Sequence, residues 1–294
     1  MLKPLAAIAL LAGAPTSERL VEGDAFVDVV LDGAPARLHV DPGAPGLPLV
    51  GAAFAERHGL RCKGFFCFGV AYGVGRQVVY GHTAVARLGF GGAKPGKRRV
   101  GWMSRDYAMD ADGTIGPAGL PEPVIRFVLG RPRAGERTVA LPLAGGGLFG
   151  DWQDSRALLT VNGVRILVRF DPGHARSLAT AAAAAAVARA HDGTLGDEHG
   201  TQEIGFGIER PYRVMTLARP LPVGPLALAA IGVRVTDGGG ANTIPEAGAD
   251  PSEVVVTAKG KKSPIMLSLG ADALARCSAL VFDKPGKQVR LTCA

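Results

Sequence analysis

The stretch Ala36–Gly43 reads Ala-Arg-Leu-His-Val-Asp-Pro-Gly, and the stretch Ile166–Gly173 reads Ile-Leu-Val-Arg-Phe-Asp-Pro-Gly. Each follows a dipeptide typical of two-residue β-hairpin turns, Asp32-Gly33 in the first copy and Asn162-Gly163 in the second. In both copies the turn glycine lies eight positions before the aspartate, and an alanine-rich stretch follows the motif. A repeat of about 130 residues far exceeds the period of solenoid proteins, so it predicts a duplicated lobe.

Further patterns recur in the two halves. In the first half we expect a short helix over 51–58, closed by Gly59, and a Gly-rich hairpin over 68–80 that turns at 73–76 and is followed by a strand over 83–88. In the second half we expect a helix over 179–190 and a hairpin within 193–213. The later part of the second half is longer, which predicts an insertion around 238–251.

Composition favours a globular protein rich in turns and short strands. The chain has 294 residues, 47% of them apolar, with 42 Gly and 21 Pro. The Gly-, Pro- and charge-rich segment 130–155 predicts a boundary between lobes of residues 21–140 and 141–294. The net charge is +7. Its densest basic runs, 94–99 and 259–262, lie in Gly/Pro loops without interleaved aromatic residues, so we expect no nucleic-acid partner.

Residues 1–20 resemble a short secretory signal or a disordered N-terminus. Met1-Leu2-Lys3 precedes an apolar stretch over 5–14 that ends in Ala12-Gly13-Ala14, a plausible cleavage site. The stretch is about half the roughly 20 residues that a membrane-spanning helix needs. We therefore expect export, to the periplasm or outside the cell, and no membrane span.

The four cysteines agree with an oxidising compartment. Cys277 and Cys293 bracket a Lys-Pro-Gly-Lys turn, so a hairpin there would place them opposite each other, and Cys62 and Cys67 are five positions apart. Disulfides are therefore expected for all four. Zinc is the alternative, but the spacing departs from the usual ligand pattern. We expect no metal and no cofactor.

Two aspartates on facing turns can share one proton. Two neighbouring carboxylates do not both ionise easily, so one acts as an acid and the other as a base. A water between them can then attack an amide carbonyl, and Asp41 and Asp171 are the candidate catalytic pair. The glycine after each aspartate's proline, Gly43 or Gly173, allows a tight turn whose N–H can face the carboxylate. His174 follows the second motif where the first has Ala44, and we expect it to be exposed.

The succession of strand, Asp-x-Gly, helix, Gly-rich hairpin and terminal hairpin resembles the pepsin/retropepsin superfamily of aspartic peptidases, in particular exported bacterial proteins with two retropepsin-like lobes in one chain. The resemblance extends from about residue 25 to the end. It implies a mostly-β, bilobal pepsin-like acid-protease fold, with two pseudo-symmetric β-barrel lobes and short helices. It further implies that Tyr72, Gly73 and Gly75 belong to a flap that covers the substrate.

The family motif is Asp-Thr-Gly or Asp-Ser-Gly, whose hydroxyl makes hydrogen bonds between the lobes. Pro42 and Pro172 have neither a hydroxyl nor a backbone N–H. Two functions stay open: an aspartic endopeptidase acting on a peptide or protein in the interlobe cleft, and a protein of the same fold that binds peptides or proteins without cleaving them.

Overall fold

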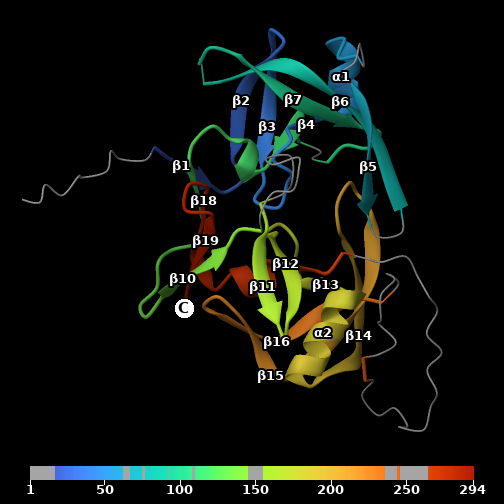
Figure 1. Ribbon diagram of the computed structural model, residues 1–294, viewed down its shortest axis with the longest axis vertical. Helices are drawn as coiled ribbons and strands as arrows, with labels where there is room; N and C mark the ends of the chain where they lie inside the picture. The colour runs from blue at the N-terminus through green and yellow to red at the C-terminus, as the bar shows by residue number, and fades with distance from the viewer. Residues whose placement is uncertain are drawn as a thin grey trace, which may run out of the picture.

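The structure, a computed structural model of the chain, describes residues 17–61, 67–74, 77–91, 93–107, 110–144, 155–235, 244–245 and 264–294. Within these ranges the strands form three sheets. Figure 1 shows two lobes, one above the other, with the third sheet (β1, β9, β10, β18 and β19) beside the region where they meet.

The first lobe is built on a seven-stranded sheet. Its strands follow the order β2 (Phe26–Leu31), β3 (Ala34–Val40), β8 (Gly113–Ile115), β4 (Leu49–Val50), β7 (Gly96–Met103), β6 (Gln77–Phe90) and β5 (Phe68–Val74). The short helix α1 (Ala52–Arg57) follows β4, and a 3₁₀ turn, η1 (Pro117–Gly119), follows β8.

The second lobe repeats this order strand for strand. Its sheet runs β11 (Ala157–Val161), β12 (Val164–Phe170), β17 (Met266–Leu269), β13 (Leu178–Thr180), β16 (Leu226–Arg234), β15 (Glu209–Val223) and β14 (Gly193–Glu203). Strand directions agree as well: β3 with β8 and β12 with β17 are parallel pairs, whereas β4 with β8 and β13 with β17 are antiparallel. The mostly-β, bilobal pepsin-like fold expected from the sequence is confirmed.

The third sheet combines segments from the start, middle and end of the chain. Its strands are β1 (Glu18–Glu22), β9 (Val124–Val128), β18 (Cys277–Asp283), β19 (Gln288–Cys293) and β10 (Arg137–Pro142). Phe282 on β18 is fully buried, and its ring meets Phe127 at 5.8 Å and Phe170 at 5.9 Å between centroids, edge to face in both cases. The sheet therefore packs directly beneath the strand that leads to Asp171.

The two motif hairpins form as expected. Asp32 and Gly33 have φ values of 48° and 90°, and Asn162 and Gly163 have 44° and 79°. These left-handed conformations suit the primed turns of tight hairpins. On each strand that leads to an aspartate, alternate side chains are buried.

Several boundaries differ from the expectations. The segment 83–88 is not a separate strand, because β6 continues unbroken from Gln77 to Phe90. The helix expected from 179 begins later, as α2 (Ala181–His191), because β13 ends at Thr180, whose side chain caps the helix by accepting from the Ala183 N–H at 3.3 Å. Another short helix, α3 (Ala271–Leu274), follows β17.

Some predictions fall outside the described residues. These are residues 1–16 of the signal or disordered N-terminus predicted over 1–20, Cys62, Gly75, part of the boundary segment (145–154) and most of the insertion around 238–251. The last residues of the predicted N-terminal segment are ordered, since β1 begins at Glu18. The lobe boundary and the Cys62–Cys67 disulfide therefore stay predictions. In the described part of the chain, no helix is both long and apolar enough to cross a membrane.

The terminal hairpin carries the expected disulfide. Cys277 and Cys293 are cross-strand partners on β18 and β19, and their sulfur atoms are bonded. The bond closes a loop with a sequence separation of 16 residues. The disulfide joins β19 to β18, the strand that carries the buried Phe282.

We expect the Cys277→Ser/Cys293→Ser variant to lose about 3 kcal/mol of unfolding free energy, because opening a loop of this length increases the entropy of the unfolded chain. Urea denaturation of variant and wild type measures the difference. As a control, reductant should lower the stability of the wild type at least to that of the variant, since it also opens the predicted Cys62–Cys67 disulfide. A variant as stable as oxidised wild type would contradict the expectation.

Candidate functional site

Asp41 and Asp171 occupy equivalent turns at the ends of β3 and β12. The Asp41 N–H donates to the Ile115 carbonyl at 3.2 Å, and the Asp171 N–H donates to the Leu269 carbonyl at 2.9 Å. Each aspartate is thus hydrogen-bonded to the end of the parallel neighbour of its strand, β8 or β17. The duplicated topology brings both carboxyl groups to matching places in the two lobes.

A glycine packs against each turn. A methyl group added at Gly116 would lie 2.1 Å from the Ala44 carbonyl oxygen, and one added at Gly270 would lie 2.5 Å from the Arg176 carbonyl carbon. Only a residue without Cβ permits this close approach of the two backbones. This explains physically why the segment after β8 and the segment after β17 share a glycine.

The Asp41 carboxyl accepts a hydrogen bond from its own turn. The Gly43 N–H donates to Asp41 Oδ1 at 2.7 Å, as expected for a glycine at this position. Protein atoms surround the carboxyl group closely, and this burial, together with the negative charge of Asp171, raises the Asp41 pKa above the ordinary aspartate value of 3.8. Asp41 therefore stays protonated to higher pH than an exposed aspartate.

Asp171 has the opposite electrostatic environment. Its Oδ2 lies 3.1 Å from Arg169 Nη2 and 2.6 Å from His174 Nδ1. Burial by itself disfavours the carboxylate, but the His174 hydrogen bond and the charges of Arg169 and His174 outweigh it and lower the Asp171 pKa below 3.8. The same pairing overcomes burial at His174 and raises the pKa of the imidazole above 6.5.

The expectation that His174 would be exposed is wrong. Its side chain is only 22% exposed and pairs with Asp171 three positions earlier. The turn causes this arrangement, because the His174 backbone N–H donates to the Asp171 carbonyl at 3.1 Å and brings the side chain back toward the carboxylate. Ala44 makes the matching backbone bond to Asp41 but has no side chain to pair with it.

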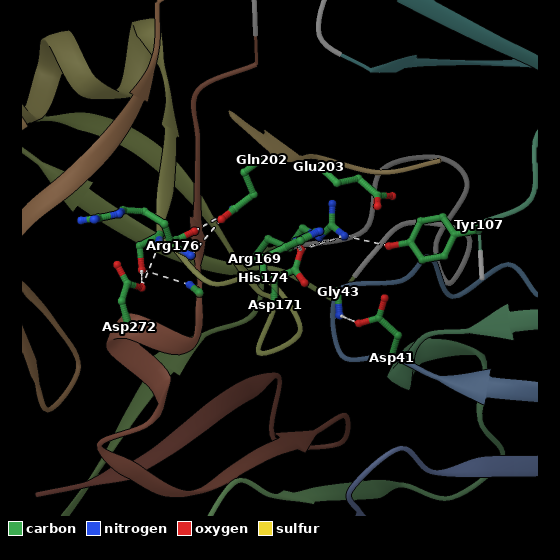
Figure 2. Close-up of polar contacts among 12 residues, drawn as sticks. Asp41, Gly43, Tyr107, Arg169, Asp171, His174, Arg176, Gln202, Glu203 and Asp272 are labelled. Carbon is green, nitrogen blue, oxygen red and sulfur yellow. Dashed lines mark hydrogen bonds and ion pairs between the residues drawn. The ribbon is translucent and has the colours of Figure 1, made fainter. Parts of the chain in front are cut away.

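The segment after Asp171 is held on two sides, as Figure 2 shows. Asp272 Oδ1 accepts from the Ser177 N–H at 2.8 Å and from the Ser177 hydroxyl at 2.6 Å. The Gln202 side chain bonds both the N–H and the carbonyl of Arg176, each at 2.9 Å. These bonds fix the backbone that presents His174.

Arg169 connects the two lobes. It lies on β12, two positions before Asp171, which directly follows the strand, so the strand period places both side chains on the same face. Nη2 of Arg169 also donates to the Tyr107 hydroxyl in the first lobe at 2.7 Å, and Figure 2 shows the guanidinium extending from Asp171 toward that ring. A methyl group added at Gly43 would lie 2.6 Å from Arg169 Nε. The second motif's strand therefore contacts the first motif's turn.

The hairpin expected as a flap lies against the hairpin of the other lobe. Tyr72 on β5 is half-buried, with its ring 5.8 Å from that of Phe206, in the turn between β14 and β15. Phe206 also meets Tyr107 edge to face at 5.1 Å. Gly73 is exposed on β5, and Gly75 is outside the described residues. Residues of the two hairpins thus share one apolar cluster.

Sequence reasoning missed three residues of this site. Arg169 could have been assigned from the strand period, since it shares a face with Asp171. His174 could have been assigned from its position three residues after the aspartate. Tyr107 has no local signal, because it lies 62 positions from its partner Arg169.

The described residues contain no group of three or more His, Cys, Asp or Glu arranged to hold a metal ion. The charged and polar side chains described at the site include the two aspartates, Arg169, His174 and Tyr107, and the charge of Glu203 also acts on His174.

No protein-family model matches the chain, and no curated protein matches it. Among solved structures, one that is similar is an aspartic proteinase from Irpex lacteus. It is 12% identical, the match covers 92% of this chain and 94% of that chain, and the TM-score is 0.40. At that level the likeness supports no inference about chemistry, so any function has to be argued from the site itself.

Proposed function

We propose that the chain is an aspartic-type endopeptidase that hydrolyses peptide bonds with Asp41 as the acid and Asp171 as the base. The single observation that supports this best is geometric: the two aspartates end equivalent turns, and Arg169, which pairs with Asp171 Oδ2, also lies against the Asp41 turn at Gly43. The opposite directions of the two pKa shifts agree with this assignment. Acid and base assignments follow from paired titratable groups whose environments separate their pKa values. Here Arg169 and His174 stabilise one carboxylate, while burial keeps the other carboxyl protonated.

In the proposed reaction a water lies between the carboxyl groups. Asp171 takes a proton from this water as its oxygen attacks the amide carbon, and Asp41 gives its proton to the carbonyl oxygen. The resulting diol collapses when Asp171 passes its proton to the departing nitrogen and Asp41 recovers one from a hydroxyl group. The products are a carboxylic acid and an amine, and both aspartates return to their initial states.

The test is cleavage of an unfolded protein over acid to neutral pH, with fragments identified by mass spectrometry. Cleavage at internal peptide bonds by wild type, absent from an Asp41→Asn preparation made in the same way, supports the proposal. Equal cleavage by both preparations, or none by wild type, would refute it.

We expect kcat/KM to follow a bell-shaped pH profile. The active form has Asp171 ionised and Asp41 protonated. Activity should therefore rise as pH increases through the lowered pKa of Asp171, below 3.8, and fall as pH increases through the raised pKa of Asp41, above 3.8. In His174→Gln the rising limb should move to higher pH, because a group that lowers the Asp171 pKa is gone. A rising limb that stays at the wild-type pH would contradict this assignment.

A second candidate function, peptide binding without cleavage, is favoured by one observation. Asp171 Oδ2 is paired with both a guanidinium and an imidazole, which lower its basicity, and a weaker base accepts a proton from water less readily. Calorimetry with a peptide library fraction separates the two functions. Saturable binding with all peptides intact after prolonged incubation would establish the binding function.

A further inference from the structure

We propose that Arg169 and Tyr107 form a brace between the lobes that keeps the two Asp-Pro-Gly turns in register. It would do the work that a Thr or Ser hydroxyl does in Asp-Thr-Gly or Asp-Ser-Gly turns. Arg169 and Tyr107 would be positioning residues. The catalytic part of this inference rests on the proposed function, whereas the geometric part does not.

The need for a brace follows from the prolines. Pro42 and Pro172 each occupy the position of the missing hydroxyl, and proline contributes neither a side-chain donor nor a backbone N–H. Catalytic groups have to be held to within about 0.5 Å, so another contact has to fix the turns relative to each other.

Arg169 has the contacts that this role requires. Its side chain is 11% exposed, and one nitrogen, Nη2, lies 3.1 Å from Asp171 Oδ2 and donates to the Tyr107 hydroxyl at 2.7 Å. Its Nε packs against Gly43, because a Cβ added at that glycine would lie only 2.6 Å from Nε. One side chain therefore touches its own motif, the turn of the opposite motif and a residue of the other lobe. The planar, multi-donor guanidinium suits such a junction better than an ammonium group does.

Tyr107 offers a rigid end for the brace. It lies a few residues after β7 in the first lobe, and its ring packs edge to face on Phe206 of the second lobe at 5.1 Å. The ring belongs to the apolar cluster shared by the two lobes. Packing thus orients the phenol, so that its hydroxyl lies at a fixed place for Arg169.

The brace is one-sided. The residue that matches Arg169 in the first copy is His39, two positions before Asp41. The His39 ring lies 5.5 Å from that of Phe26 in its own lobe. The two copies have therefore diverged at this position. A single arginine in the second copy suffices, because it reaches the turn of the first.

The test is Tyr107→Phe, which removes the hydroxyl and keeps the ring on Phe206. We expect kcat to fall on the order of 10- to 100-fold with KM little changed, the effect of a small displacement of catalytic groups. We also expect the Asp171 carboxyl, followed by ¹³C NMR, to titrate closer to the ordinary aspartate value of 3.8. Tyr80→Phe is the matched control, because Tyr80 is 66% exposed and lies outside the site.

Arg169→Lys provides a second variant, since it retains the charge but not the planar group. It should move the Asp171 titration and kcat in the same direction as Tyr107→Phe. The proposed brace would be refuted if Tyr107→Phe had the wild-type kcat and the wild-type Asp171 titration. Full activity in Arg169→Lys would refute it as well. If wild type proves not to be a peptidase, the NMR titration still decides the geometric part, so the two proposals fail separately.

Discussion

Changing Asp41 or Asp171 to Asn is expected to lower kcat/KM by about 10³-fold, within the usual range for a general acid or base. The double variant should be no slower than the slower single variant, because groups that act as one unit show strongly non-additive losses. Initial rates on a defined peptide measure all three.

The two substitutions should differ in their effect on stability. Asp41 is held protonated at acid pH, so a neutral amide in its place should change the unfolding free energy little there. Asp171→Asn removes the partner of both Arg169 and His174 and should cost about 1.5–3 kcal/mol, the value of a hydrogen bond to a charged group. Asp28→Asn on the exposed face of β2 is the control. For activity, two results would contradict a two-aspartate catalyst. One is a double variant whose loss of kcat/KM equals the product of the two single losses, and the other is a low kcat/KM in Asp28→Asn.

Gly43→Ala and Gly173→Ala are expected to behave very differently, although the two glycines hold the same place in the motif. A methyl group at Gly43 would lie 2.6 Å from Arg169 Nε and 2.9 Å from the Phe170 carbonyl oxygen, whereas one at Gly173 meets nothing within 4 Å. The Phe170 carbonyl belongs to the backbone and cannot move aside as a flexible side chain can. Gly43→Ala therefore has to push the Asp41 turn away from the strand that leads to Asp171. We expect a loss of about 1–3 kcal/mol in stability and of about 10²-fold in activity.

Gly173→Ala should remain close to wild type in both quantities and so serves as the matched control. Thermal unfolding and initial rates measure the pair. If both variants were equally active, the close contact between the two motifs could not be what aligns the carboxyl groups.

Local sequence patterns predicted the hairpins, the terminal disulfide and the bilobal repeat. They succeeded because each depends on residues near one another in the chain: a turn dipeptide between apolar runs, or two cysteines about a central turn. The same reasoning did not predict structure that depends on contacts between distant parts of the chain. In the third sheet β1 pairs in parallel with β9, and the paired residues Glu18 and Val124 are more than 100 positions apart in the sequence. No local sequence pattern predicts that pairing.

Some residues of the candidate site could likewise be predicted from the sequence and others could not. The two aspartates and their glycines were predictable, since the duplicated frame places them on equivalent turns. The contact of Arg169 with the other lobe was not predictable, because its partner Tyr107 lies 62 positions away in the sequence.

By itself, the sequence determined that the chain has two matching turns that each end a strand on an aspartate. Turn dipeptides, strand alternation and the glycine after each proline act over a few residues, so both copies form the same local structure. The tertiary structure decided how unequal the two aspartates are. Arg169 and His174 pair directly with Asp171, whereas burial and the charge of Asp171 act on Asp41, and the negative charge of Asp171 reaches Asp41 only once the lobes have packed together.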